Sequence, residues 1–334
     1  MPSIKQLILK TTGSNSLDQI PFLYFIDHKI KQLKAQQAKK KIESRKNIDL
    51  FEYKDLYSQI SYYPHSPILE NNFYGNAHVL SKSFDINLYT RIEHGLYFGS
   101  IVPYRNLESN THSIITFSEY RRNFIKEKTD CKVICAGPYI HYADPLFNEN
   151  YIQKVKIKLG KTLLVFPSHS IPSVHAKFDI NNFIKSIQDI QQDFDTVLVC
   201  LYWQDIALGY AEIYKAAGFL IVTAGHIADY YFLNRLKTII QLSDLTISNN
   251  IGTHIGYCIH LKKPHCIINS QVIYIAGEDR HAAAAELSIR NKQDEKSLLN
   301  AKAQILDLFS NIQFSISKEQ HECIQYYFGT PTKP

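Results

Sequence analysis

Short apolar runs alternate with helical repeats through the second half of the chain. The runs are continuous, like TLLVF at 162–166, and such runs are typical of strands buried on both faces of a sheet. In the segment after the first run, apolar residues from Phe183 to Ile190 recur at helical spacing. This alternation predicts a parallel sheet with helices on both faces over residues 155–310. The other predicted strands are 196–203, 219–225, 245–250 and 264–268, and the other predicted helices are 206–217, 231–242, 253–261 and 282–310.

The first half is less regular, but the same rhythm begins near residue 86. We expect strands at 86–95, 112–118 and 131–137, and a helix at 119–128 that Ser118 opens as its cap. The predicted fold is therefore α/β, with two Rossmann-like domains that face each other across a cleft. The predicted units are an N-terminal domain (1–150), a link (144–159), a C-terminal domain (155–310) and a tail (311–334) that packs back on the N-terminal domain.

Composition narrows the class of protein. The 334 residues are 45% hydrophobic and 20% charged, as in globular proteins, and a net charge of +6 is too small to predict nucleic-acid binding. The six cysteines lack zinc spacing, and several lie in apolar runs, which predicts free thiols in the cytoplasm. No apolar run is long enough to cross a membrane. The basic segment 33–46 predicts an exposed helix, with peripheral contact to acidic lipid at the inner face of the inner membrane as the alternative.

Three loops after predicted strands offer chemistry, because ligands of open parallel sheets bind at the carboxyl ends of the strands. In the first loop, Glu93 or His94 could accept a proton, and Gly95 allows an unusual backbone angle. The second loop, Ser168-His169-Ser170, suits contact with a phosphate or a leaving group. The third joins a strand to a helix, whose amino end favours an anion. Its candidate residues are Ser248, Asn249, Asn250, Gly252, Thr253 and His254.

Each of these loops also has a structural interpretation, as a glycine turn or a helix cap. Three further residues are candidates for the same cleft, although a cap or a surface position explains them as well. Gln204 follows the second strand of the C-terminal domain, His226 follows the third, and Arg235 lies on the next helix. The sequence offers no spacing of metal ligands, so we expect no metal site.

In this order the loops resemble those of bacterial sialyltransferases and of related enzymes that transfer Kdo and other ulosonic acids. That family has an acidic-acidic-Gly motif, then a His-Pro motif, then a Ser/Thr pair. Here Glu93-His94-Gly95, His169-Ser170 and Ser248 to Thr253 follow the same order, with histidine at the second acidic position and serine in place of proline. The segments IEHGLYFGS, VFPSHS and ISNNIGTHIGYCIHLKKPH and the tail YYFG also resemble those of bacterial surface-polysaccharide transferases.

The resemblance implies a metal-independent glycosyltransferase of the GT-B type, acting in the synthesis of capsule, O-antigen or lipooligosaccharide. Its donor would be a nucleotide sugar, with CMP-sugars favoured, and its acceptor a glycan or glycolipid. Glu93 or His94 would be the base, and the second and third loops would hold the donor phosphate. No cofactor is implied. Two alternatives stay open, namely a nucleotide-sugar epimerase of the same fold and a non-catalytic nucleotide- or sugar-binding partner.

Overall fold

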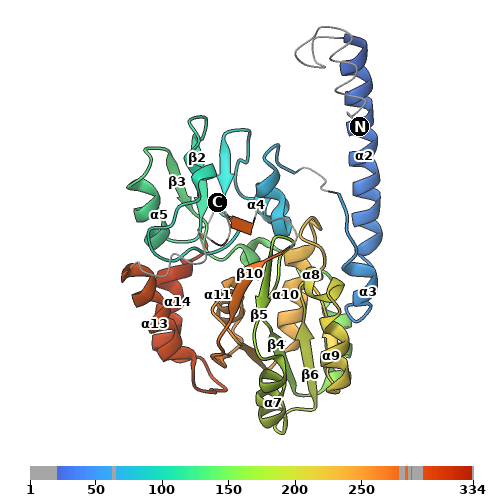
Figure 1. The fold of residues 1–334 in the computed structure, drawn as a ribbon, viewed down its shortest axis with the longest axis vertical. Coiled ribbons are helices and arrows are strands. Elements are labelled where there is room, and N and C mark those ends of the chain that lie inside the picture. The colour runs from blue at the N-terminus through green and yellow to red at the C-terminus, as the bar shows by residue number, and fades with distance from the viewer. Residues whose placement is uncertain (1–20, 62–64, 278–282, 285–286, 288–295, 333–334) are drawn as a thin grey trace.

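The computed structural model describes residues 21–61, 65–277, 283–284, 287 and 296–332 (Figure 1). Its largest sheet lies in the C-terminal half and has five parallel strands in the order β7-β6-β4-β8-β9. By position along the chain this is the order 3-2-1-4-5 of a doubly wound α/β sheet. The strands are β4 (Thr162–Phe166), β6 (Thr196–Cys200), β7 (Leu220–Val222), β8 (Leu245–Ser248) and β9 (His265–Ile267).

Helices flank this sheet because their apolar faces match its buried strands. In α7, Asp179 caps the first turn by accepting from Asn182 N, and Phe183 and Ile187 are buried against the sheet. The connecting helices are α6 (Glu149–Leu159), α7 (Ile180–Gln191), α8 (Trp203–Ala207), α9 (Tyr210–Ala216), α10 (Phe232–Leu242), α11 (Thr253–His260) and α13 (Lys296–Phe309).

The N-terminal half has a smaller parallel sheet in the order β1-β2-β3, formed by Thr90–Ile92, Ser113–Thr116 and Lys132–Cys135. Helix α5 (Glu119–Lys126) follows β2, and Ser118 caps it as predicted, accepting from Arg121 N. The α/β class and the parallel sheets flanked by helices are therefore confirmed. Short elements surround this sheet: α4 (Asn76–Leu80) and the 3-10 helices η2 (Leu69–Gly75), η3 (Tyr104–Leu107) and η4 (Tyr139–Tyr142).

Two local features differ from the prediction, and two further observations concern the predicted link and the predicted helix 282–310. The expected helix 206–217 is split into α8 and α9 at Gly209, whose φ of +87° suits glycine. The segment 144–159, predicted as a link, contains α6. An antiparallel pair, β5 (Val174–Lys177) with β10 (Ile273–Ala276), was not predicted. Of the expected helix 282–310, residues 278–282, 285–286 and 288–295 lie outside the described residues, and α13 forms the rest.

The N-terminal arm, residues 42–61, packs on the C-terminal half rather than on the N-terminal sheet. Tyr53 lies in the core of the five-stranded sheet and its hydroxyl donates to Glu212, 3.1 Å away. Arg45 is buried and holds the arm in a bend by donating to the carbonyls of Leu56 and Ser58. The arm consists of the end of α2 (Pro21–Arg45), then α3 (Tyr53–Leu56) and the segment after it.

The outer part of α2 extends away from the rest of the protein (Figure 1), and Leu33 and Lys34 on it are exposed. Within the described part of the chain, no helix combines the length and apolarity needed to span a bilayer. Residues 1–20 lie outside the description. The basic segment is thus helical and mostly exposed, although Ala38, Ile42 and Arg45 on it are buried, and its contact with lipid stays a prediction.

The tail forms α14 (Lys318–Phe328), which packs on both α5 and α11. Ser118 Oγ donates to the carbonyl of Tyr327, and Phe328 lies edge-on to Phe117 of the N-terminal half. Gly329 is so close to the carbonyl of Phe117 that a Cβ would lie 2.3 Å from it. The tail therefore links the two halves.

Candidate functional site

The five-stranded sheet reverses its direction of winding between β4 and β8, and the loops after these two strands meet there. Ser168 donates its backbone N–H and its hydroxyl to Asn249 Oδ1, at 2.7 and 2.9 Å. The second and third predicted loops are thus joined at the position where open α/β sheets bind ligands. Asn249 is fully buried, and its Nδ2 has no hydrogen-bond partner among the described residues. A buried amide in this state calls for a ligand or water as its acceptor.

Helix α11 begins in the third loop with no side-chain cap. Gly252 is its N-cap in extended backbone, and no side chain accepts from the first turn. The ring of His254 folds back over Gly252, where a Cβ would lie 2.7 Å from the imidazole. This close approach explains the glycine. The uncapped N–H groups and the helix dipole make this end of α11 suited to an anion.

The first predicted loop, from the N-terminal half, reaches the same helix end. Leu96 donates its backbone N–H to Thr253 Oγ1 at 3.2 Å. A Cβ on Gly95 would lie 3.5 Å from the same hydroxyl oxygen. Thr253 therefore accepts from the N-terminal half and keeps its own proton to donate.

A row of rings connects His94 with the second loop. His94 lies 6.4 Å from the ring centroid of Tyr74, Tyr74 lies 6.3 Å from Tyr202, and Tyr202 lies 4.6 Å from His169. Tyr74 has a φ of +58°, a strained value for a residue of its size, and such residues cluster at functional sites. Sequence reasoning missed Tyr74 and Tyr202. Tyr202 lies at the end of the predicted strand 196–203 and could have been found, whereas nothing in the local sequence marks Tyr74.

Glu93 has a structural position that argues against the prediction of a catalytic base. Its side chain is fully buried in an ion pair with Arg121, whose Nη2 and Nε lie 2.8 and 3.2 Å from the two carboxylate oxygens. Thr116 Oγ1 donates to the same carboxylate at 2.6 Å, and Asn106 Nδ2 at 3.5 Å. A carboxylate held by this many donors is typical of a structural ion pair, and the catalytic role of Glu93 stays a prediction. His94 is half-buried and belongs to the row of rings.

Two of the predicted phosphate-binding serines are also used within the protein. Ser170 is buried; its N–H donates to Asp205 Oδ1 at 3.0 Å, and its hydroxyl accepts from Ala176 N at 3.2 Å. Ser248 is buried as well, and its hydroxyl donates to the carbonyl of Asn250 and lies 3.0 Å from His265 Nε2. Both hydroxyls bond to groups at the strand ends, so this geometry favours a structural role, and a phosphate role for them stays a prediction.

His254 and Arg235 do not supply the positive charge that a phosphate site would use. His254 stacks on Phe166 at 4.9 Å, and burial lowers its pKa to about 3, so the ring is neutral at pH 7. Arg235 is fully buried, paired with Asp229 at 3.2 Å and donating to the carbonyl of Ala224 at 2.7 Å. Arg235 thus holds the loop after β7 in place.

The remaining candidates line the edges of the site. Asn250 is half-buried, and its Nδ2 donates to Tyr274 of β10 at 3.4 Å. Gln204 is half-buried in the first turn of α8. His226 follows β7 and lies against Trp203, with the ring centroids 4.4 Å apart. Within the described residues, no group of three histidines, cysteines or carboxylates is arranged to hold a metal ion.

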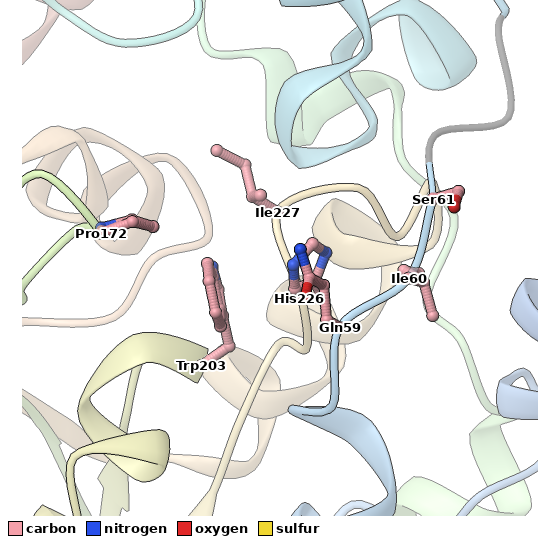
Figure 2. Close-up of a pocket in the computed structure, with 7 residues that line it drawn as sticks. All are labelled: Gln59, Ile60, Ser61, Pro172, Trp203, His226 and Ile227. Carbon is pink, nitrogen blue, oxygen red and sulfur yellow. The ribbon is translucent and has the colours of Figure 1, made fainter. Parts of the chain in front are cut away.

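A cavity of about 720 Å³ lies beside this row of rings, at the ends of β6 and β7 (Figure 2). Trp203 and His226 come from the loops after those strands, Pro172 from the loop after β4, and Gln59–Ser61 from the N-terminal arm. In Figure 2 the indole ring stands between Pro172 and the arm. Of the cavity's lining, sequence reasoning had placed only His226 in the cleft.

Comparison by sequence with protein families and with curated proteins yields no match. Among solved structures, the chain is similar to the wall teichoic acid polymerase TagF, with 14% identity and a TM-score of 0.34 over 55% of this chain and 50% of that one. It is similar to S. aureus MnaA bound to UDP, with 11% identity and a TM-score of 0.36 over 78% and 68%. The pneumococcal O-GlcNAc transferase GtfA with UDP and GlcNAc gives 10% identity and a TM-score of 0.32 over 71% and 50%. The chain spans about half the length of the TagF and GtfA chains.

Proposed function

We propose that this protein is a glycosyltransferase that moves a sugar from a nucleotide donor to a glycan or glycolipid acceptor. The observation that carries the proposal is the meeting of loops from both halves at the β4–β8 switch point, where Leu96 of the N-terminal half bonds to Thr253 at the uncapped start of α11. In this proposal the N-terminal half places the loop with His94, which serves the acceptor, next to an anion site on the C-terminal half. Transfer between two bound substrates needs this arrangement.

The donor phosphate lies at the amino end of α11. Its donors are the backbone N–H groups of Gly252 and Thr253, the hydroxyl of Thr253, and Asn249 Nδ2, which has no partner among the described residues. His169 lies at the edge of the site. Together with the helix dipole they stabilise the charge that develops on the leaving nucleotide. In this proposal they replace a divalent ion.

His94 is the base. It takes the proton of the acceptor hydroxyl while the hydroxyl oxygen forms a bond to the anomeric carbon of the donor sugar. The bond between that carbon and the phosphate oxygen breaks, and its electron pair leaves with the nucleotide. A general base contributes about 10²–10⁴-fold to the rate, so loss of the imidazole is measurable.

In its finer form, the hypothesis names the donor as a CMP-activated ulosonic acid, such as sialic acid or Kdo. This choice of donor rests on the order of the three motifs. A thermal-shift screen against CMP, UDP, GDP and their sugars tests the nucleotide, because a ligand that binds only the folded state raises the Tm. A shift with CMP supports this donor class, and a shift with UDP alone rejects it.

Turnover tests the reaction itself. Incubation with the nucleotide sugar that gives the shift, with and without a glycan acceptor, should yield a glycosylated product only when the acceptor is present. Conversion of the donor sugar without acceptor indicates an epimerase. Binding of nucleotide with no conversion of any donor indicates a non-catalytic binding protein.

A further inference from the structure

The cavity at Trp203 has the surroundings of a site for an uncharged ring. Seven residues line it: Gln59, Ile60, Ser61, Pro172, Trp203, His226 and Ile227. None is charged at pH 7, because burial lowers the pKa of His226 to about 4, helped by nearby Arg45 and Lys41. Those two cations bind backbone carbonyls, with Lys41 Nζ 3.0 Å from that of Gln59. Among the described residues, the side chains that line the cavity are therefore uncharged, and the nearest cations, Arg45 and Lys41, are bonded to the arm.

The cavity does offer an aromatic face and hydrogen-bonding groups around it. The indole N–H of Trp203 is buried and has no partner among the described residues. His226 Nδ1 accepts from Ala228 N at 3.1 Å, so the neutral ring carries its proton on Nε2, which can donate to a ligand. Gln59 and Ser61 add an exposed amide and hydroxyl. A sugar ring matches this lining, with its C–H face on the indole and its hydroxyls on the polar groups.

The cavity and the proposed base lie at different places along the row of rings. Three ring-to-ring steps separate Trp203 from His94, through Tyr202 and Tyr74, with centroids 5.8, 6.3 and 6.4 Å apart. Most of its lining from the C-terminal half follows β6 and β7, whereas α11 follows β8. A ligand that spans both places is a chain of sugars rather than one ring.

We infer that this cavity is a subsite for a neutral sugar unit of the acceptor glycan, placed inward from the reacting end, with Trp203 as its platform. This inference depends on the proposed function, because only a glycosyltransferase has an acceptor glycan. The N-terminal arm then has a role in specificity, because Gln59 and Ser61 form one wall of the subsite. Acceptors of two or more sugars should be used better than monosaccharides.

Trp203 is the only tryptophan in the chain, so fluorescence excited at 295 nm reports on this cavity alone. The probes are lactose, maltose and N,N′-diacetylchitobiose, with cytidine and uridine as competitors for the same face. We expect a saturable change with at least one disaccharide and none with the nucleosides. A response to a nucleoside but to no disaccharide, or no response to any probe, overturns the inference.

Variants of Gln59 and Ser61 on the N-terminal arm test the wall of the subsite and leave the buried core unchanged. Gln59→Ala should weaken disaccharide binding about fivefold, the loss of one hydrogen bond, whereas Gln36→Ala on the exposed part of α2 should change nothing. Equal binding by wild type, Gln59→Ala and Ser61→Ala contradicts the assignment.

In turnover, Trp203→Ala should raise the acceptor KM about tenfold and leave the donor KM unchanged, with Trp203→Phe in between. Disaccharide binding without any transfer would reject the proposed function and leave the subsite standing.

Discussion

Replacing Glu93 tests whether its carboxylate has a structural or a catalytic role. In Glu93→Gln the side chain keeps its shape, but one oxygen becomes an NH₂ group that faces the donors of Arg121 and Thr116. Arg121 is left as a buried charge without its counter-ion, and breaking a buried pair in this way costs about 3–5 kcal/mol. We expect the lower end of that range, because Arg121 also donates to the carbonyls of Gly99 and Ile101, which partly compensate its charge.

Urea unfolding followed by circular dichroism measures this loss as a lower midpoint at unchanged slope. The double variant Glu93→Gln/Arg121→Met removes the unpaired charge and should recover part of the stability, which gives a coupling energy for the pair. If Glu93→Gln is within about 1 kcal/mol of the wild type and yet loses turnover by 10²-fold or more, the carboxylate is the base and the structural interpretation is refuted.

Three further predictions concern the cleft and the core. His94→Gln should lower kcat about 10²–10⁴-fold while the nucleotide-induced rise in Tm stays the same; an unchanged kcat excludes His94 as the base. Thr253→Val should raise the donor KM about tenfold and also leave Leu96 N without its acceptor, which a thermal scan would show as a small loss of Tm. Burial raises the pKa of Asp205 from 3.8 to about 7, so the folded state binds the extra proton and stability from this group falls as pH rises from about 4 to 7; Asp205→Asn should flatten that part of the pH–stability curve, and parallel curves would contradict it.

The sequence allowed the sheets to be predicted, because continuous apolar runs place buried strands directly. Each of the eight strands of the two parallel sheets lies within a predicted run, and the loops at 94–96, 168–169 and 249–253 are neighbours in the structure. The functions of the site residues stay predictions. The sequence did not show which polar residues of those loops bond to other parts of the protein, because their partners lie far along the chain. Glu93 pairs with Arg121 on α5, and Ser248 bonds to His265 on the next strand.

The N-terminal arm shows the same limit on a larger scale, and it also bears on how the site works. Its sequence has no strong periodicity, and its docking depends on distant contacts: Arg235 donates to the carbonyl of Arg45, and Tyr230 donates to Glu43. These contacts join the arm to the half that carries Trp203 and His226. The wall and floor of the cavity at Trp203 therefore belong to one packed unit, so the cavity is already formed before any relative motion of the two halves. A preformed subsite lowers the ordering cost of binding a flexible glycan, whereas the contact between Leu96 and Thr253 crosses between the halves and depends on how they come together.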